Sequence, residues 1–373
     1  ALVDELLAKA ETLHASDVHF EPTARGLLVK YRLDGALSTF EELPKALAEN
    51  VVSRLKVLGG LLTYRNDVPQ EGRIDPGDAA ETGVLDRRVA VFPTIHGQRA
   101  VVRLFHDEKG LCELDQLGLA PGLLAGLRRI AASNRGVLLL TGPAGSGKST
   151  TLAALLRHIV RLCPGKSIVA LEDPVERRIE GVTQAEISPH GRMTFPVALR
   201  SLLRQDPEVL MVGEIRDAET AGIVIDAGLT GHLLMSTMHS GTPAGALVRL
   251  LEMGVEPYQV TSAVSAVLNQ RLLRRLCPEC KRPGGGGTGL PGGCDECFGT
   301  GYRGRILIAE LVEMDTQLRR AVLAKADLEE LESVLAARGH ASLLTGGMGL
   351  VTDGVTSREE LHRVCGWSDG GET

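Results

Sequence analysis

The sequence predicts an α/β fold, in which a core of parallel strands and helices follows a smaller α+β domain. Three observations predict it. A glycine-rich loop at 142–149 separates the apolar run 137–140 from a helical stretch that begins at Thr150. After this loop, apolar strands at 167–171, 209–212 and 233–236 alternate with helical stretches, as in parallel βα units. Before it, short strands are separated by tight turns.

Composition limits the classes of protein that the chain can form. With 373 residues, the chain is long enough for two or three domains with sizeable cores. The net charge of −6 provides no global basic signature for nucleic acid. The sequence contains no apolar run of the roughly 18 residues that span a bilayer and no leading signal peptide. We therefore expect a soluble, cytoplasmic protein, which a membrane-bound partner could still recruit.

The first domain is expected to span residues 1–108 and to contain an antiparallel sheet. An amphipathic helix opens it, with apolar residues that include Leu2, Leu6 and Leu7. Segments 26–32, 88–92 and 98–104 alternate apolar and polar residues, as half-buried strands do. Asp34-Gly35 and His96-Gly97 indicate the turns between them.

The glycine-rich loop fits the pattern G-x-x-x-x-G-K-[ST] and predicts a nucleotide site. A buried strand, the loop and a helix N-terminus follow one another, so backbone N–H groups and the helix dipole face an anion. Lys148 adds a positive charge, and the hydroxyl of Ser149 is placed for Mg²⁺. The nucleotide-binding residues predicted here are Gly142, Pro143, Ala144, Gly145, Ser146, Gly147, Lys148, Ser149 and Thr150.

Polar residues stand at the ends of the later strands of the core, which we expect to span 109–276. Glu172 and Glu214 each follow an apolar strand, and His232 and His239 bracket a third. Ligands gather at the carboxyl ends of strands in an open α/β sheet. We therefore expect these four groups to meet near the γ-phosphate, where a carboxylate can activate water or hold Mg²⁺.

Four of the seven cysteines form two C-x-x-C pairs, Cys277/Cys280 and Cys294/Cys297. Four thiolates a short loop apart can close tetrahedrally on Zn²⁺, and a reducing cytosol argues against disulfides. We expect a zinc-binding lobe at 277–305, followed by a mostly helical tail at 306–373 that starts with a strand near 306–311. Cys112, Cys163 and Cys365 are expected to be buried apolar residues.

Taken together, the motifs resemble those of the secretion "traffic" ATPases, in the GspE/PilB-type branch of the type II/type IV secretion and pilus-assembly superfamily. Besides the phosphate loop, the resemblance rests on segments in both halves of the chain. These are ASDVHFEP (15–22), RLDG (32–35), PQEGR (69–73), LEDPVE (171–176), LRQDPE (203–208), VGEIRD (212–217), TGHLLMSTMH (230–239) and QRLLRRLC (270–277).

The resemblance implies a RecA-like core, a PAS-like first domain, and ATP, Mg²⁺ and Zn²⁺ as cofactors. It implies that Lys148 contacts phosphate, that Glu172 activates water, and that Glu214 is tied to the Mg²⁺ site and catalysis. His232 and His239 correspond to the family's His box. Arginines complete the implied site, with Arg216 as a catalytic residue and Arg88, Arg103, Arg200, Arg204 and Arg249 near the nucleotide or a subunit interface. The division of labour between the two glutamates stays open.

The function implied is an ATP-hydrolysing motor, expected to be hexameric, that powers assembly of a pilus or type II pseudopilus. Its implied partners are an inner-membrane platform protein and a membrane-anchored docking protein. The family's extra N-terminal docking domain is absent and the sequence begins with Ala, so we expect a truncated or processed chain, or a different mode of docking.

Three other readings remain. A pilus-retraction or DNA-uptake motor belongs to the same superfamily, but retraction motors generally lack the four cysteines. A nucleic-acid translocase or zinc-bearing binding module is disfavoured by the acidic net charge and the lack of clustered aromatic residues. A nucleotide-binding scaffold without hydrolysis is disfavoured by the intact Lys148, Glu172 and Glu214.

Overall fold

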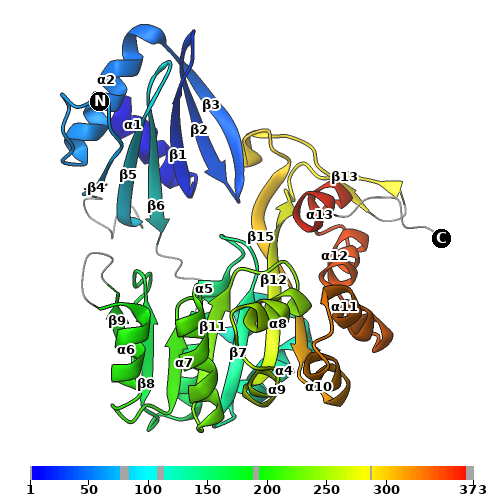
Figure 1. Ribbon diagram of the computed structural model, residues 1–373. Coiled ribbons are helices and arrows are strands. Elements are labelled where there is room, and N and C mark those ends of the chain that lie inside the picture. The colour runs from blue at the N-terminus through cyan, green and yellow to red at the C-terminus, as the bar shows by residue number, and fades with distance from the viewer. Residues whose placement is uncertain (1, 76–83, 107–112, 188–192, 286–287, 367–373) are drawn as a thin grey trace. The chain divides into compact units, whose positions relative to one another are not determined.

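The chain divides into two compact units, Ala1–Lys109 and Gly110–Thr373, each with its own sheet (Figure 1). The computed structural model describes residues 2–75, 84–106, 113–187, 193–285 and 288–366. Cys112, predicted to be a buried residue, lies outside the described residues. In the part of the chain that is described, none of the helices combines the length and the apolar character needed to cross a membrane.

The first unit contains a six-stranded antiparallel sheet in the order β3-β2-β1-β6-β5-β4. Its strands are β1 (Asp17–Pro22), β2 (Gly26–Leu33), β3 (Ala36–Pro44), β4 (Gln70–Ile74), β5 (Val84–Thr94) and β6 (Gly97–His106), and its helices are α1 (Leu2–Thr12) and α2 (Lys45–Leu58). Alternate strand residues such as Val18, Val89 and Val102 are buried in a core with the apolar residues of both helices. The intervening residues lie on the opposite face of the sheet because side chains alternate along a strand.

The second unit contains a seven-stranded sheet in the order β15-β12-β7-β11-β10-β8-β9, in which β15 alone runs antiparallel to its neighbour. Its strands are β7 (Gly136–Thr141), β8 (Ile168–Glu172), β9 (Thr183–Glu186), β10 (Val209–Val212), β11 (Leu233–Met238), β12 (Val264–Leu276) and β15 (Tyr302–Glu313). The inner strands are buried on both faces, which explains their continuous apolar runs.

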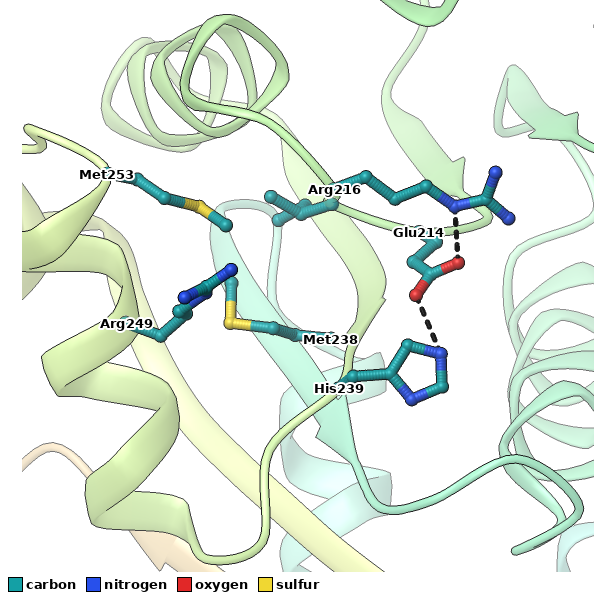
Figure 2. A pocket seen from close by; sticks show the side chains of 7 residues that line it. Glu214, Arg216, Met238, His239, Arg249 and Met253 are labelled. Carbon is teal, nitrogen blue, oxygen red and sulfur yellow. Dashed lines mark hydrogen bonds and ion pairs between the residues drawn. The ribbon is translucent and has the colours of Figure 1, made fainter.

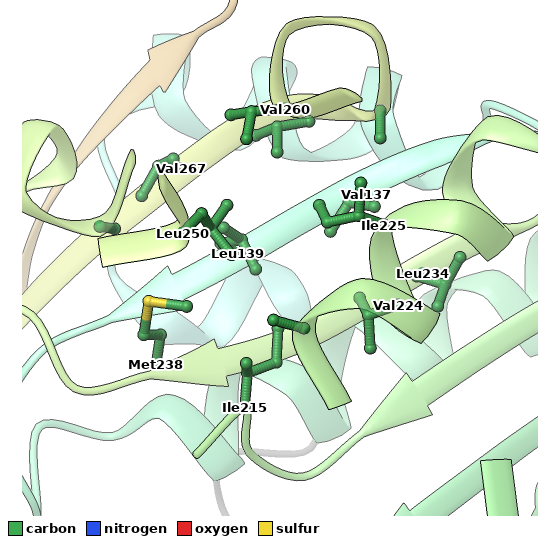
Figure 3. Close-up of a cluster of buried hydrophobic side chains, with 14 of the residues drawn as sticks. Val137, Leu139, Ile215, Val224, Ile225, Leu234, Met238, Leu250, Val260 and Val267 are labelled. Atoms are coloured by element: carbon green, nitrogen blue, oxygen red, sulfur yellow. The ribbon is translucent and has the colours of Figure 1, made fainter. Parts of the chain in front are cut away.

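Helices cover both faces of this sheet. On one face, α4 (Pro121–Ala131), α5 (Lys148–Leu162) and the 3₁₀ turn η1 (Leu114–Leu117) pack on alternate strand residues such as Leu138 and Leu140. Figure 3 shows part of the core on the other face, where Val137 and Leu139 meet apolar residues of several helices. Those helices are α6 (Phe195–Leu202), α7 (Ala218–Leu229), α8 (Pro243–Glu252), α9 (Pro257–Ala263), α10 (Thr316–Leu323) and α11 (Leu328–Ala337).

The long strands β12 and β15 form an antiparallel pair, and the cysteine segment is inserted between them. This segment contains the short pair β13 (Arg282–Pro283) and β14 (Gly289–Leu290) and the 3₁₀ turn η3 (Asp295–Cys297). The helices α12 (Leu343–Thr352) and α13 (Arg358–Cys365) pack on the far part of the pair in a small core around Leu273 and Ile308. Sequence analysis did not anticipate β12, because arginines interrupt its apolar pattern.

Candidate active site

The site lies along the edge of the sheet where β7, β11, β10 and β8 end. These four strands are parallel and adjacent, so their carboxyl ends open on one side. The phosphate loop follows β7, His239 follows β11, Glu214 follows β10, and Glu172 is the last residue of β8. The topology therefore brings together groups that are almost 100 residues apart in the sequence.

The phosphate loop has the backbone conformation that its glycines permit. Gly142 and Gly147 have φ angles of 141° and 90°, which L side chains rarely adopt. A Cβ on Gly142 would also lie 2.6 Å from the carbonyl oxygen of Gln270. Lys148 Nζ donates hydrogen bonds to the carbonyl oxygens of Gly142 and Pro143, at 2.7 and 2.9 Å. Burial lowers the pKa of Lys148, Arg271 lowers it further, and Glu214 acts in the opposite direction.

The other predicted phosphate-loop residues form the loop and the first turn of α5. Pro143, Ala144, Gly145 and Ser149 are exposed, whereas Ser146 is buried. Ser149 and Thr150 stand in the first turn of α5, where backbone N–H groups have no partner within the helix. The loop thus presents an open, electropositive helix N-terminus to an anion.

Glu172 is a half-buried carboxylate with neutral hydrogen-bond donors. Gln184 Nε2, on the neighbouring strand β9, donates to Glu172 Oε1 at 2.8 Å, and the backbone of Glu176 also donates. Burial raises the pKa of Glu172, while the hydrogen bond from Gln184 acts in the opposite direction. Gln184 was missed by sequence analysis because a single polar residue on a short edge strand carries no motif.

Glu214, in contrast, is held between cationic or ionisable side chains, as Figure 2 shows. Arg216 Nε lies 2.7 Å from Glu214 Oε2, and His239 Nε2 lies 2.9 Å from Glu214 Oε1. Arg216 Nη1 also reaches Asp173 Oδ2 at 3.4 Å, so this arginine joins the ends of β8 and β10. The hydrogen bond to Glu214 raises the pKa of Arg216.

A pocket of about 330 Å³ opens beside this cluster. Arg249 of α8 contributes to its wall, and its guanidinium lies 3.7 Å from Glu252. The residues that line the pocket are Glu214, Ile215, Arg216, Met238, His239, Arg249 and Met253. The other predicted core arginines lie outside it. Arg200 pairs with Glu219 at 2.8 Å on the surface of α6 and α7, and Arg204 is exposed.

We predicted that His232 lies near the γ-phosphate together with Glu172, Glu214 and His239. Within one subunit, this prediction is wrong. His232 precedes β11 and lies at the amino end of the strand, where its carbonyl oxygen accepts a hydrogen bond from Gly136, the first residue of β7. Its Nδ1 is 3.1 Å from the carbonyl oxygen of Ala227. Both histidines flank one strand, but strand direction places only His239 beside Glu214.

In the first unit, the predicted Arg88 and Arg103 lie opposite each other on β5 and β6. The same cross-strand register also aligns two arginines that were not predicted as site residues. The full row across the sheet is Arg73, Arg88, Arg103, Asp17 and Arg32. Because the residues are in register, their side chains share the face opposite the apolar core.

Two carboxylates hold this arginine row in place. Asp17 lies 3.1 Å from Arg103 Nε and 3.3 Å from Arg32 Nε, and it also accepts a hydrogen bond from Ser16 Oγ at 2.8 Å. Asp86 pairs with Arg73 at 2.6 Å and with Arg88 at 3.1 Å. With four arginines and two carboxylates, the row keeps a positive charge that suits a phosphate-bearing ligand.

The four clustered cysteines fit a tetrahedral metal site. Their sulfur atoms all lie within 4.8 Å of one another. The sulfur–sulfur distances are 3.9 Å for Cys277–Cys294, 3.6 Å for Cys280–Cys297 and 3.7 Å for Cys294–Cys297. Four sulfurs about 2.3 Å from a central Zn²⁺ would be separated by about 3.8 Å. The donor set and its spacing therefore suit this ion.

Comparison with known proteins shows similarity over almost the whole chain. The family model described as "Type II/IV secretion system protein" matches residues 1–363. The chain is 41% identical to the type II secretion system protein HxcR of Pseudomonas aeruginosa, over 97% of this chain and 76% of that protein. It is 38% identical to the type IV pilus assembly ATPase PilB of Thermus thermophilus, over 96% of this chain.

The chain spans 42% of the length of that PilB protein. Among solved structures, it is similar to the pilus retraction motor PilT with bound ADP, with a TM-score of 0.64 and 24% identity. This similarity covers 98% of this chain and 97% of PilT. At this identity it shows a shared fold.

The environment of Glu172 predicts how its carboxylate responds to a change at Gln184. In Gln184→Met, the donor that stabilises the ionised form is lost, so the pKa of Glu172 should rise further. If hydrolysis needs ionised Glu172, the acid limb of the pH–rate profile moves to higher pH. Steady-state ATPase rates between pH 5 and 9 test this. The control Thr183→Val, at an exposed position on the same strand, should keep the wild-type profile; an unshifted acid limb in Gln184→Met would contradict the assignment.

Proposed function

We propose that this chain, which belongs to the type II/IV secretion system protein family, is an ATP-hydrolysing motor that powers assembly of a pilus or a type II pseudopilus. The observation that carries the proposal is the shared sheet edge, where Lys148, Glu172, Glu214 and His239 stand together. Relatives named for secretion and pilus assembly are 38–41% identical, whereas the retraction motor is 24% identical. This difference favours assembly over retraction.

ATP binds at the phosphate loop. The backbone N–H groups of the loop and of the first turn of α5 receive the phosphates, and Lys148 leaves the carbonyls of Gly142 and Pro143 to pair with them. Ser149 and Glu214 are the residues that hold Mg²⁺, directly or through water. When bound, this ion neutralises charge on the phosphate oxygens.

Glu172 is the general base that orients and deprotonates the attacking water. Burial raises its pKa and so favours acceptance of a proton, while the hydrogen bond from Gln184 acts in the opposite direction. Glu214 already has Arg216 and His239 on its two oxygens, so neither oxygen is free to receive the attacking water. Its role is to organise the cation and to position His239 near the γ-phosphate.

The arginines make hydrolysis depend on the arrangement of domains and subunits. A cation supplied from another domain or subunit neutralises the charge that develops on the transferred phosphoryl group. Arg88 and Arg103 supply it from the first domain, and Arg216 from within the core. Arg200, Arg204 and Arg249 line the nucleotide site or a subunit interface. Six subunits form the ring.

The motor works in the cytoplasm at the inner membrane. A membrane-anchored docking protein holds it there, and domain closure displaces a platform protein as ATP is hydrolysed. Cys277, which follows β12, and Cys280, Cys294 and Cys297, which precede β15, would hold Zn²⁺. A bound ion would cross-link the insertion between these two strands.

The roles of Lys148 and Glu214 predict different losses. Lys148→Ala should abolish ATP turnover and weaken nucleotide binding, because the phosphates lose their charged partner. Glu214→Gln should bind ATP with an affinity within roughly threefold of wild type but turn it over at least about 100 times more slowly. Phosphate release and titration with a fluorescent ATP analogue measure the two effects. Lys166→Ala, beyond the opposite end of α5, is the matched control and should behave as wild type. Wild-type turnover in both site variants would refute the site.

The cysteine cluster predicts about one zinc ion per chain. Metal analysis of the purified protein measures this. Cys280→Ser should lose most of the zinc and lower the melting temperature, since three thiolates no longer close the site. Cys163→Ser, which is outside the cluster, should retain the wild-type zinc content. A zinc-free wild type purified without chelators would require another role for these cysteines.

A further inference from the structure

The phosphate loop rests on a stretch of β12 that the proposed mechanism does not use. Gln270 is fully buried, and its Nε2 donates to the carbonyl oxygen of Ser146 at 2.8 Å. A Cβ on Gly142 would collide with the Gln270 carbonyl, and one on Gly147 would lie 3.2 Å from Gln270 Nε2. The loop therefore packs directly on β12, and Gly142 and Gly147 are needed for this contact as well as for their φ angles.

Arg271, the next residue, connects this part of β12 to a second loop. Its Nη1 donates to the carbonyl oxygen of Gln270 at 2.9 Å and to Asn269 Oδ1 at 2.8 Å. Its Nη2 donates to the carbonyl oxygen of Gly241 at 2.7 Å. Gly241 lies two residues after His239, in the loop that leads from β11 to α8. One planar guanidinium thus joins the loop of His239 to the strand that supports the phosphate loop.

Asn269 completes the connection. Its Nδ2 donates to the same Gly241 carbonyl at 3.0 Å and to Glu310 Oε1 at 2.8 Å, while its Oδ1 also accepts from Thr141 Oγ1 at 3.2 Å. Thr141 is the last residue of β7, immediately before the phosphate loop. Because Asn269 is buried, these hydrogen bonds do not compete with solvent and fix its orientation.

We propose that Arg271, oriented by Asn269, is a positioning residue that sets the distance between His239 and the phosphate loop, and so couples the group facing the γ-phosphate to the loop that binds it. The inference rests on the proposed function. Arg271 Nη1 would lie 3.1 Å from a Cβ on Gly142, so the guanidinium stands against the first residue of the loop. It acts through the two loops it joins, and its charge also acts on Lys148, whose pKa it lowers.

The test compares Arg271→Gln with Arg275→Gln, which removes the same charge from an exposed position on the same strand. Arg271→Gln should lower kcat at least about tenfold, because small misplacements of reacting groups are costly in rate. Its affinity for an ATP analogue should stay within about threefold of wild type, since the backbone of the loop still binds phosphate. Arg275→Gln should leave both quantities unchanged.

Arg271→Lys keeps the positive charge but cannot span three acceptors with one rigid fork. This variant should melt at the wild-type temperature and still lose at least about threefold in kcat. It therefore tests the positioning role even if Arg271→Gln does not fold. Wild-type kcat in either folded variant would overturn the inference, as would a loss in affinity equal to the loss in kcat. Both variants are compared with an active wild-type protein. If the wild type is inactive, the proposed function itself is wrong. If the wild type and Arg271→Gln are equally active, only the positioning role is wrong.

Discussion

The direction of the strands is the constraint on which the site depends. Parallel strands end on one side of a sheet, so every residue that follows such a strand is delivered to the same edge. In this chain the edge receives the phosphate loop from β7, His239 from β11, Glu214 from β10 and Glu172 from β8. This arrangement requires that all four strands are buried on both faces, with helices packed on each side.

The two glutamates at this edge differ in the side chains that surround them. Glu172 and Glu214 are both strand-end glutamates, but the first has the amide of Gln184 as its side-chain donor and the second has Arg216 and His239. A neutral neighbour leaves a carboxylate able to accept a proton, whereas a cationic neighbour stabilises the charged form. The two carboxylates therefore differ in their partners: Gln184 lies on β9, whereas Arg216 follows β10 and His239 follows β11.

Local patterns in the sequence were sufficient to predict part of this structure. The phosphate loop and the two cysteine pairs could be recognised because residue spacing alone defines each motif. In the structure the loop lies between β7 and α5, and the four sulfurs are clustered. Strand direction had to be known to separate His232 from His239. The contribution of β12 could not be predicted, since Asn269 and Arg271 acquire their roles from partners about 30 to 130 residues away. The arginine row across β2, β1, β6, β5 and β4 likewise depends on cross-strand register, which no local motif encodes.

The strand β12 also has a mechanical consequence. It is hydrogen-bonded to β7 on one side and to β15 on the other, and it runs from the support of the phosphate loop to the first cysteine of the insertion. Cys277 lies eight positions after Asn269, which corresponds to about 26 Å of extended chain. A tilt of about 5° at the loop end would therefore move the cysteine end by about 2 Å. For such a tilt, the insertion that carries the four cysteines lies at the end of the strand where the displacement is largest.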